Sequence, residues 1–155
     1  MKFVESLETR TCLAASFTAL INFAPLNAPR APGMQTDYGA EFGVRRGGLS
    51  FGWDTDVQAK AVDRDLPVSV TQRNDTFINM ENGSNDHTWE IAVPQSGQYK
   101  VYIVAGDPAV GSERMAITAE DDVVIAGMTK GRKKWLEGAA TVNVSDGRLS
   151  VAGIN

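Results

Sequence analysis

Cysteine and histidine are almost absent from this sequence, which has one of each, Cys12 and His87. A lone cysteine cannot form an intramolecular disulfide, and a structural zinc site takes four cysteine or histidine ligands. We therefore expect neither a disulfide nor a structural zinc site. No stretch reaches the ~18 apolar residues of a membrane-spanning helix. Positive charge is also scarce, because 15 Lys and Arg stand against 19 Asp and Glu, a net charge of −4. The concentrated basic surface that nucleic acids require is therefore missing.

The rest of the composition is that of an ordinary globular protein. The chain has 155 residues, 43% of them hydrophobic and 22% charged, which suits one domain with a single core. Its 15 Gly and 6 Pro favour many turns over long helices. We expect residues 1–17 to be an N-terminal arm, helical or disordered, and residues 18–155 to be the folded domain.

Short alternating segments dominate the domain, most clearly from residue 87 onward, as in half-buried strands. Pro94–Gly97 and Ser145–Gly147 have turn composition, and we expect each to close a hairpin between the strands that flank it. Residues 26–48 are expected to be a long irregular loop. The pattern predicts an all-β protein, an antiparallel β-sandwich or jelly roll. The predicted strands are residues 19–24, 87–93, 98–105, 115–119, 123–126, 139–144 and 148–152.

A series of short motifs runs through roughly residues 19–152. They are Ile21-Asn22-Phe23, Asp37-Tyr38-Gly39, Phe51-Gly52-Trp53, Arg73-x-Asp75-Thr76-Phe77, Trp89-Glu-Ile-x-Val-Pro94, Gly97-x-Tyr99-x-Val101, Gly106-Asp107 and Val144-x-Asp146-Gly147-Arg148-Leu149. In this order they resemble the galactose-binding-like, malectin-like β-sandwich modules that accompany extracellular polysaccharide-degrading enzymes. The resemblance implies a non-catalytic carbohydrate-binding module that holds sugars with loops at one edge or on one sheet face.

Both ends of the chain bear on its context. Residues 5–14 resemble the LEPRxLL-type motif of large exported bacterial surface proteins, with Thr9 where that motif has proline. The likeness implies a secreted or cell-surface protein, with other domains of a longer parent as partners. Members of the sandwich family usually continue beyond the Asp-Gly-Arg-Leu hairpin with a final strand. We therefore expect a short last strand here, or a chain that is a fragment of a longer protein.

The segment Gly48-Leu-Ser50-Phe-Gly52 matches G-x-S-x-G, the nucleophile elbow of serine hydrolases. That elbow needs a strand-to-helix turn within a parallel sheet, whereas the residues after Trp53 have no apolar helical period. We therefore expect no catalysis by Ser50. The glycines are expected to permit turns and positive φ around a short strand.

Tryptophans are the first candidates for a ligand site, because an indole presents a large flat apolar surface to a sugar ring. Trp89 falls in the apolar phase of its strand with Ile91 and Val93, so it is expected in the core. Trp53 and Trp135 lie on predicted turns or loops. Each is either a ligand platform or a loop aromatic that packs onto the sandwich.

Charged residues supply the other candidates. Arg73 and Asp75 either pair with each other to order their loop or bind sugar hydroxyls or a uronate, for which Arg73 is the natural carboxylate partner. Asp107 follows a predicted strand and is a further ligand-binding candidate. Several carboxylates are also of the type that calcium prefers, although no EF-hand spacing is present and solvated turn residues explain them equally. These are Asp54, Asp56, Asp75, Asp107, Asp121 and Asp122.

The sequence thus predicts a secreted or surface-directed β-sandwich that binds polysaccharide or oligosaccharide without catalysis. The predicted ligand-binding residues are Trp53, Arg73, Asp75, Asp107 and Trp135; a structural calcium is a further hypothesis. The alternative is a structural or protein-interaction sandwich that has no sugar site. That alternative is favoured if both Trp53 and Trp135 are buried and the loops around them show no concavity.

Overall fold

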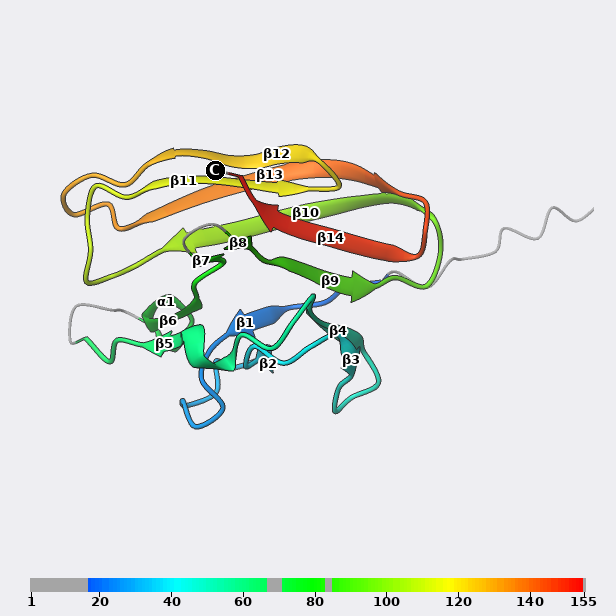
Figure 1. The fold of residues 1–155 in the computed structure, drawn as a ribbon, viewed down its shortest axis with the longest axis horizontal. Helices are drawn as coiled ribbons and strands as arrows, with labels where there is room; N and C mark the ends of the chain where they lie inside the picture. The colour runs from blue at the N-terminus through cyan, green and yellow to red at the C-terminus, as the bar shows by residue number, and fades with distance from the viewer. Residues whose placement is uncertain (1–16, 67–70, 83–84, 155) are drawn as a thin grey trace, which may run out of the picture.

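A computed structural model describes residues 17–66, 71–82 and 85–154, so the arm expected at residues 1–17 lies, except for its last residue, outside the described part. Strands make up most of this part, which confirms the all-β fold class (Figure 1). The strands are β1 (Ile21–Phe23), β2 (Gln35–Asp37), β3 (Gly43–Val44), β4 (Ser50–Trp53), β5 (Ala61–Asp63), β6 (Thr76–Ile78), β7 (Glu81–Asn82), β8 (Asn85–Asp86), β9 (Thr88–Ala92), β10 (Gly97–Gly106), β11 (Arg114–Ala119), β12 (Asp122–Met128), β13 (Trp135–Val144) and β14 (Arg148–Gly153). Two short helices, η1 (Gln58–Lys60) and α1 (Gln72–Asp75), interrupt them.

Two layers enclose the core. One is a six-stranded sheet in the order β12-β11-β14-β9-β4-β3, and the other is the antiparallel ladder of β10 and β13. Both layers contribute to one apolar cluster, with Phe51 and Ile91 from the first and Val142 from the second. The layers approach closely at Gly138, where a Cβ atom would lie 1.9 Å from the Val124 carbonyl oxygen. Any larger residue at this position would push β13 away from β12.

Neither of the two hairpins predicted at residues 94–97 and 145–147 forms. Strand β9 pairs with β14 and β4, whereas β10 pairs with β13, so each connection passes from one sheet to the other. The two corners lie together, because the Val93 N–H donates to the Gly147 carbonyl at 2.9 Å and the Ser96 hydroxyl to the Ser145 carbonyl at 3.0 Å. Alternation of apolar and polar residues shows which face of a strand is buried but not which strand pairs with it. Turns of similar composition occur in a hairpin within one sheet and in a connection between two sheets.

The tight hairpin of this part of the molecule joins β11 and β12 instead. Its two central residues, Glu120 and Asp121, have φ angles of 49° and 66°. Two left-handed residues in a two-residue connection follow the right-handed twist of the flanking strands. The sequence signal was weak because no glycine occupies the turn.

The expectation of an irregular loop at residues 26–48 is wrong in part, because this segment contains β2 and β3. Strand β2 pairs in parallel with β1 and ends at Asp37, whose carboxylate is 1% exposed. This carboxylate accepts hydrogen bonds from the Gly39 N–H at 2.7 Å, the Trp53 indole at 3.1 Å and the Trp89 indole at 2.7 Å. Asp37 therefore fixes the orientation of both indole rings in the core by accepting hydrogen bonds from their N–H groups.

Candidate functional site

The outer face of the β10–β13 ladder is the candidate site. Along β10 the even-numbered residues from Gln98 to Val104 are exposed, while the odd-numbered ones pack toward the core. Along β13 the odd-numbered residues from Glu137 to Asn143 are exposed in the same way. The ladder has continuous antiparallel register, so both sets lie on one face. We name this surface the outer face; its residues are Gln98, Lys100, Tyr102, Val104, Trp135, Glu137, Ala139, Thr141 and Asn143.

Two aromatic residues lie on the outer face, each opposite a small residue. Tyr102 is 61% exposed and pairs across the ladder with Ala139. Trp135 is partly buried and pairs with Gly106, so no neighbouring Cβ crowds its ring from that strand. Trp135 and Ala139 are four residues apart on β13, about 13 Å at roughly 3.3 Å per residue. Val104, 43% exposed, lies between the two aromatic rows.

Glu137 orients the tyrosine. The Tyr102 hydroxyl donates a hydrogen bond to Glu137 Oε2, the diagonal neighbour across the ladder. This hydrogen bond is the main reason that the pKa of Tyr102 is raised above its usual value. The Tyr102 phenol donates this hydrogen bond in its neutral form. Its ring is directed along the face and remains available to a ligand.

Arg73 lies on another element, the short helix α1. Its positive charge acts on Tyr102 in the opposite sense to Glu137, lowering the pKa of the phenol. Arg73 is exposed and borders a small apolar groove of about 290 Å³. Leu20, Pro32 and Met34 also line this groove. Of the predicted ligand residues, Trp135 thus shares the outer face with Tyr102, whereas Arg73 lies on α1 at the border of this groove.

Trp53 does not take part, and its expected role as a ligand platform is corrected here. The residue is 2% exposed at the end of β4, where its indole is bonded to Asp37 and contacted by the edge of Phe23. It lies in the same core as Trp89, which is 6% exposed as expected. A ring enclosed in this way presents no face to a ligand.

The two predicted aspartates are also buried. Asp107, 5% exposed, receives two hydrogen bonds from the Arg64 guanidinium, the Nε one at 3.0 Å. Burial acts to raise the pKa of Asp107, but the Arg64 hydrogen bonds, the backbone N–H of Ala109 and the guanidinium charge together lower it. Asp75 is 7% exposed, its Oδ1 has no hydrogen-bond partner, and it forms no ion pair with Arg73. The Arg73–Asp75 pair considered above does not form.

Ser50 begins β4, so the segment after it is a strand and not the helix of a nucleophile elbow. The glycines around it behave as expected, with φ angles of 97° at Gly47, 88° at Gly48 and 145° at Gly52. His87 lies just before β9, with Lys60 Nζ 2.9 Å from Nε2 and Asp54 Oδ1 3.3 Å from Nδ1. The histidine is thus enclosed by structural neighbours.

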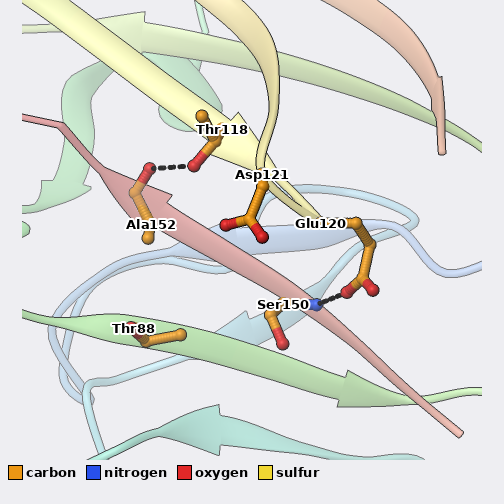
Figure 2. Close-up of a pocket in the computed structure, with 6 residues that line it drawn as sticks. All are labelled: Thr88, Thr118, Glu120, Asp121, Ser150 and Ala152. Atoms are coloured by element: carbon orange, nitrogen blue, oxygen red, sulfur yellow. Dashed lines mark hydrogen bonds between the residues drawn. The ribbon is translucent and has the colours of Figure 1, made fainter. Parts of the chain in front are cut away.

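A second, polar hollow lies on the exposed side of the six-stranded sheet and has a volume of about 220 Å³. Figure 2 shows the Asp121 carboxylate directed over β14, between Ala152 and Ser150. Glu120 is already engaged, because its Oε1 accepts the Ser150 N–H at 2.7 Å. Across the described ranges, no three His, Cys, Asp or Glu side chains gather closely enough to hold a metal ion. The hollow therefore offers one unengaged carboxylate and a few hydroxyls, less than the outer face provides.

Tyr102, Glu137 and Lys100 are the site residues that sequence reasoning missed. The sequence could have identified Tyr102, because apolar and polar positions alternate along residues 98–105. Tyr99, Val101 and Ile103 occupy the apolar positions, and Tyr102 occupies a polar one. An aromatic residue in the polar phase is expected at the surface.

No helix in the described ranges is long and apolar enough to span a membrane. Searches against protein-family models, curated proteins and solved structures returned no match to this chain.

Proposed function

We propose that this chain is a non-catalytic module that binds polysaccharide on the outer face. The observation that carries the proposal is the placement of Tyr102 and Trp135 on one exposed sheet face, with Glu137 beside them. Aromatic rings pack against the apolar C–H faces of sugars, and flanking charged groups bond to sugar hydroxyls. The distance between the aromatic rows is long enough for more than one sugar ring.

The resemblance implied two modes of binding, by loops at one edge or on one sheet face, and we propose the sheet face. Loops at the sandwich end were to supply Trp53 and the acidic residues, but these side chains are buried in the core or engaged by Arg64. A flat ladder face suits an extended chain better than a single enclosed sugar. Affinity for such a surface is expected to be modest, on the order of millimolar to micromolar. We place the module outside the cell, where the LEPRxLL-like residues 5–14 would direct it.

The test is binding to a panel of soluble polysaccharides by affinity gel electrophoresis. Tyr102→Ala and Trp135→Ala are compared with the wild type and with a control, Val123→Ala, which removes a 57% exposed side chain from β12 on the other sheet. Loss of one stacked ring is expected to weaken binding about three- to tenfold. The control is expected to bind like the wild type.

Two outcomes would overturn the proposal. If neither aromatic substitution changes retardation by a polysaccharide that the wild type binds, the site lies elsewhere. If no polysaccharide retards the wild type, the alternative of a structural or protein-interaction sandwich is favoured. Thermal melting of each variant shows whether the fold is retained.

A further inference from the structure

A contact between a lysine and the single histidine of the chain involves no residue of the outer face. The Nζ atom of Lys60, at the end of η1, lies 2.9 Å from Nε2 of His87, just before β9. On the other side of the imidazole ring, Asp54 Oδ1 lies 3.3 Å from Nδ1. Three segments that are separate along the chain thus place an amine, an imidazole and a carboxylate in one row.

The hydrogen bonds of this row have a defined direction. A lysine ammonium carries donors only, so Lys60 donates and His87 Nε2 accepts. The proton of the neutral ring then lies on Nδ1, where it faces the Asp54 carboxylate. This is the order of carboxylate, imidazole and nucleophile in which a serine hydrolase activates its serine, with an amine in place of the hydroxyl.

Lys60 is paired with a base where a carboxylate would be the common partner. Within the described residues Lys60 has no ion pair, whereas Arg64 and Arg148 are bonded to carboxylates. Asp56, on the same segment as Lys60, is engaged at both oxygens by Gln58, at 2.9 and 2.7 Å. An imidazole can take up and release a proton near neutral pH, which a carboxylate does only in acid.

Backbone hydrogen bonds fix the carboxylate and the imidazole in place. The Asp54 N–H donates to the Thr88 carbonyl at 2.9 Å, and the His87 N–H donates to the Met80 carbonyl at 3.0 Å. His87 is 8% exposed, whereas Lys60 is half-buried. The amine is therefore open to solvent in part, and the imidazole behind it is shielded.

We propose that Lys60 is a covalent modification site for aldehydes, the chemical class that includes the open-chain form of reducing sugars. Nζ gives a proton to His87 Nε2, and the free amine adds to the carbonyl carbon to form a carbinolamine. The protonated His87 then returns the proton to the carbinolamine hydroxyl, which leaves as water while the C=N bond of the imine forms. The neutral imidazole is restored, so no further reactant is needed. Asp54 is a positioning residue that orients the ring and stabilises its charged form.

The test compares two lysines in one sample. The full chain reacts with glyceraldehyde at neutral pH in the presence of cyanoborohydride, which reduces the imine to a stable amine. Mass spectrometry of the peptides gives the rate at each lysine. The reference is Lys100, which is exposed and has no ion pair within the described residues. We expect Lys60 to react about fivefold faster than Lys100 despite its lower exposure.

Variants and NMR separate the roles of the neighbours. His87→Gln keeps a side chain that can bond to Lys60 but cannot accept a proton, and it is expected to lower the Lys60 rate to that of Lys100. Asp54→Asn keeps an acceptor for Nδ1 and is expected to slow Lys60 about twofold. The matched control is Asp56→Asn, which is expected to leave the rate unchanged. In the wild type, NMR of the ring nitrogens is expected to show the proton of the neutral ring on Nδ1.

Three results would overturn the proposal. The first is a Lys60 rate equal to or below that of Lys100, because the imidazole would then only hold the ammonium. The second is an unchanged Lys60 rate in His87→Gln, with the fold verified by thermal melting. The third is a wild-type proton on Nε2. The first and third are measured on the wild type, so they do not depend on the folding of a variant, and neither bears on polysaccharide binding by the outer face.

Discussion

Within the described residues, two carboxylates accept hydrogen bonds from tryptophan or tyrosine side chains, one in the core and one on the surface. Asp37, 1% exposed, binds the indoles of Trp53 and Trp89, whereas the exposed Glu137 binds the hydroxyl of Tyr102. The chemistry is similar, but the burial differs. In the core the carboxylate satisfies N–H groups that water cannot reach, so it contributes to stability. On the surface it orients a ring that remains free to meet a ligand.

Asp107 is intermediate between these two. Its side chain is 8% exposed, but that of its partner Arg64 is 37% exposed, so solvent screens the pair. The three carboxylates thus form a series of decreasing burial. If burial decides the role of each, the stability lost on substitution should fall in the order Asp37, Asp107, Glu137.

The largest effect is expected for Asp37→Ala. The substitution leaves two indole N–H groups and the Gly39 N–H without an acceptor, each unsatisfied buried group costing about 1–3 kcal/mol. We expect the free energy of unfolding to fall by about 3 kcal/mol or more, measured by urea denaturation. A decrease in the free energy of unfolding of less than about 1 kcal/mol would contradict this prediction. The buried carboxylate of Asp37 would then stabilise the fold no more than the exposed carboxylate of Glu137 does.

The tryptophans provide the next contrast. Trp53→Phe removes the indole N–H and part of a fully enclosed ring, and is expected to cost about 1–2 kcal/mol of stability. Trp135→Phe changes a partly buried ring on the outer face and should cost less than about 0.5 kcal/mol. Denaturation midpoints of the two variants test this order. Equal losses would show that Trp135 is as structural as Trp53.

A smaller and pH-dependent effect is expected for Asp107→Asn. The pKa of Asp107 is lowered in the folded protein, so its contribution is complete above the unfolded value of about 3.9 and is lost as pH falls through the folded value. At pH 7 the variant should be less stable by about 1 kcal/mol, given the exposure of Arg64. The stabilities of variant and wild type should converge in acid, below about pH 4. A difference that is constant with pH would argue against the ion pair.

The smallest change in stability is expected for Glu137→Gln, whose readout is the titration of Tyr102. Removal of the carboxylate takes away the charged acceptor that raises the pKa of Tyr102, while the opposing charge of Arg73 stays. The pKa of the phenol should therefore fall toward its usual value, as followed by ultraviolet absorbance or by NMR of the ring. An unchanged titration would mean that Glu137 does not orient the tyrosine in solution.

Part of this structure could be predicted from the pattern of residues. Alternation along residues 87–105 identified two strands and the inward face of each, including the burial of Trp89. Glycine spacing around Ser50 indicated backbone freedom, which the positive φ angles of Gly47, Gly48 and Gly52 confirm. The pairing of the strands was not predictable, because the corners at residues 94–97 and 145–147 have the composition of hairpin turns. Only the packing of one sheet on the other distinguishes the two connections.

The sequence by itself determined the strands after residue 87, their buried faces and the all-β class, because these follow from local alternation and turn chemistry. The tertiary structure decided which aromatic residues are available. Trp53 is buried because β2 brings Asp37 beneath it, from 16 residues away in the chain. Tyr102 and Trp135 share one exposed face because β10 pairs with β13, a pairing that no local pattern encodes. Contacts between distant segments depend on how whole sheets pack, and the candidate site is made of such contacts.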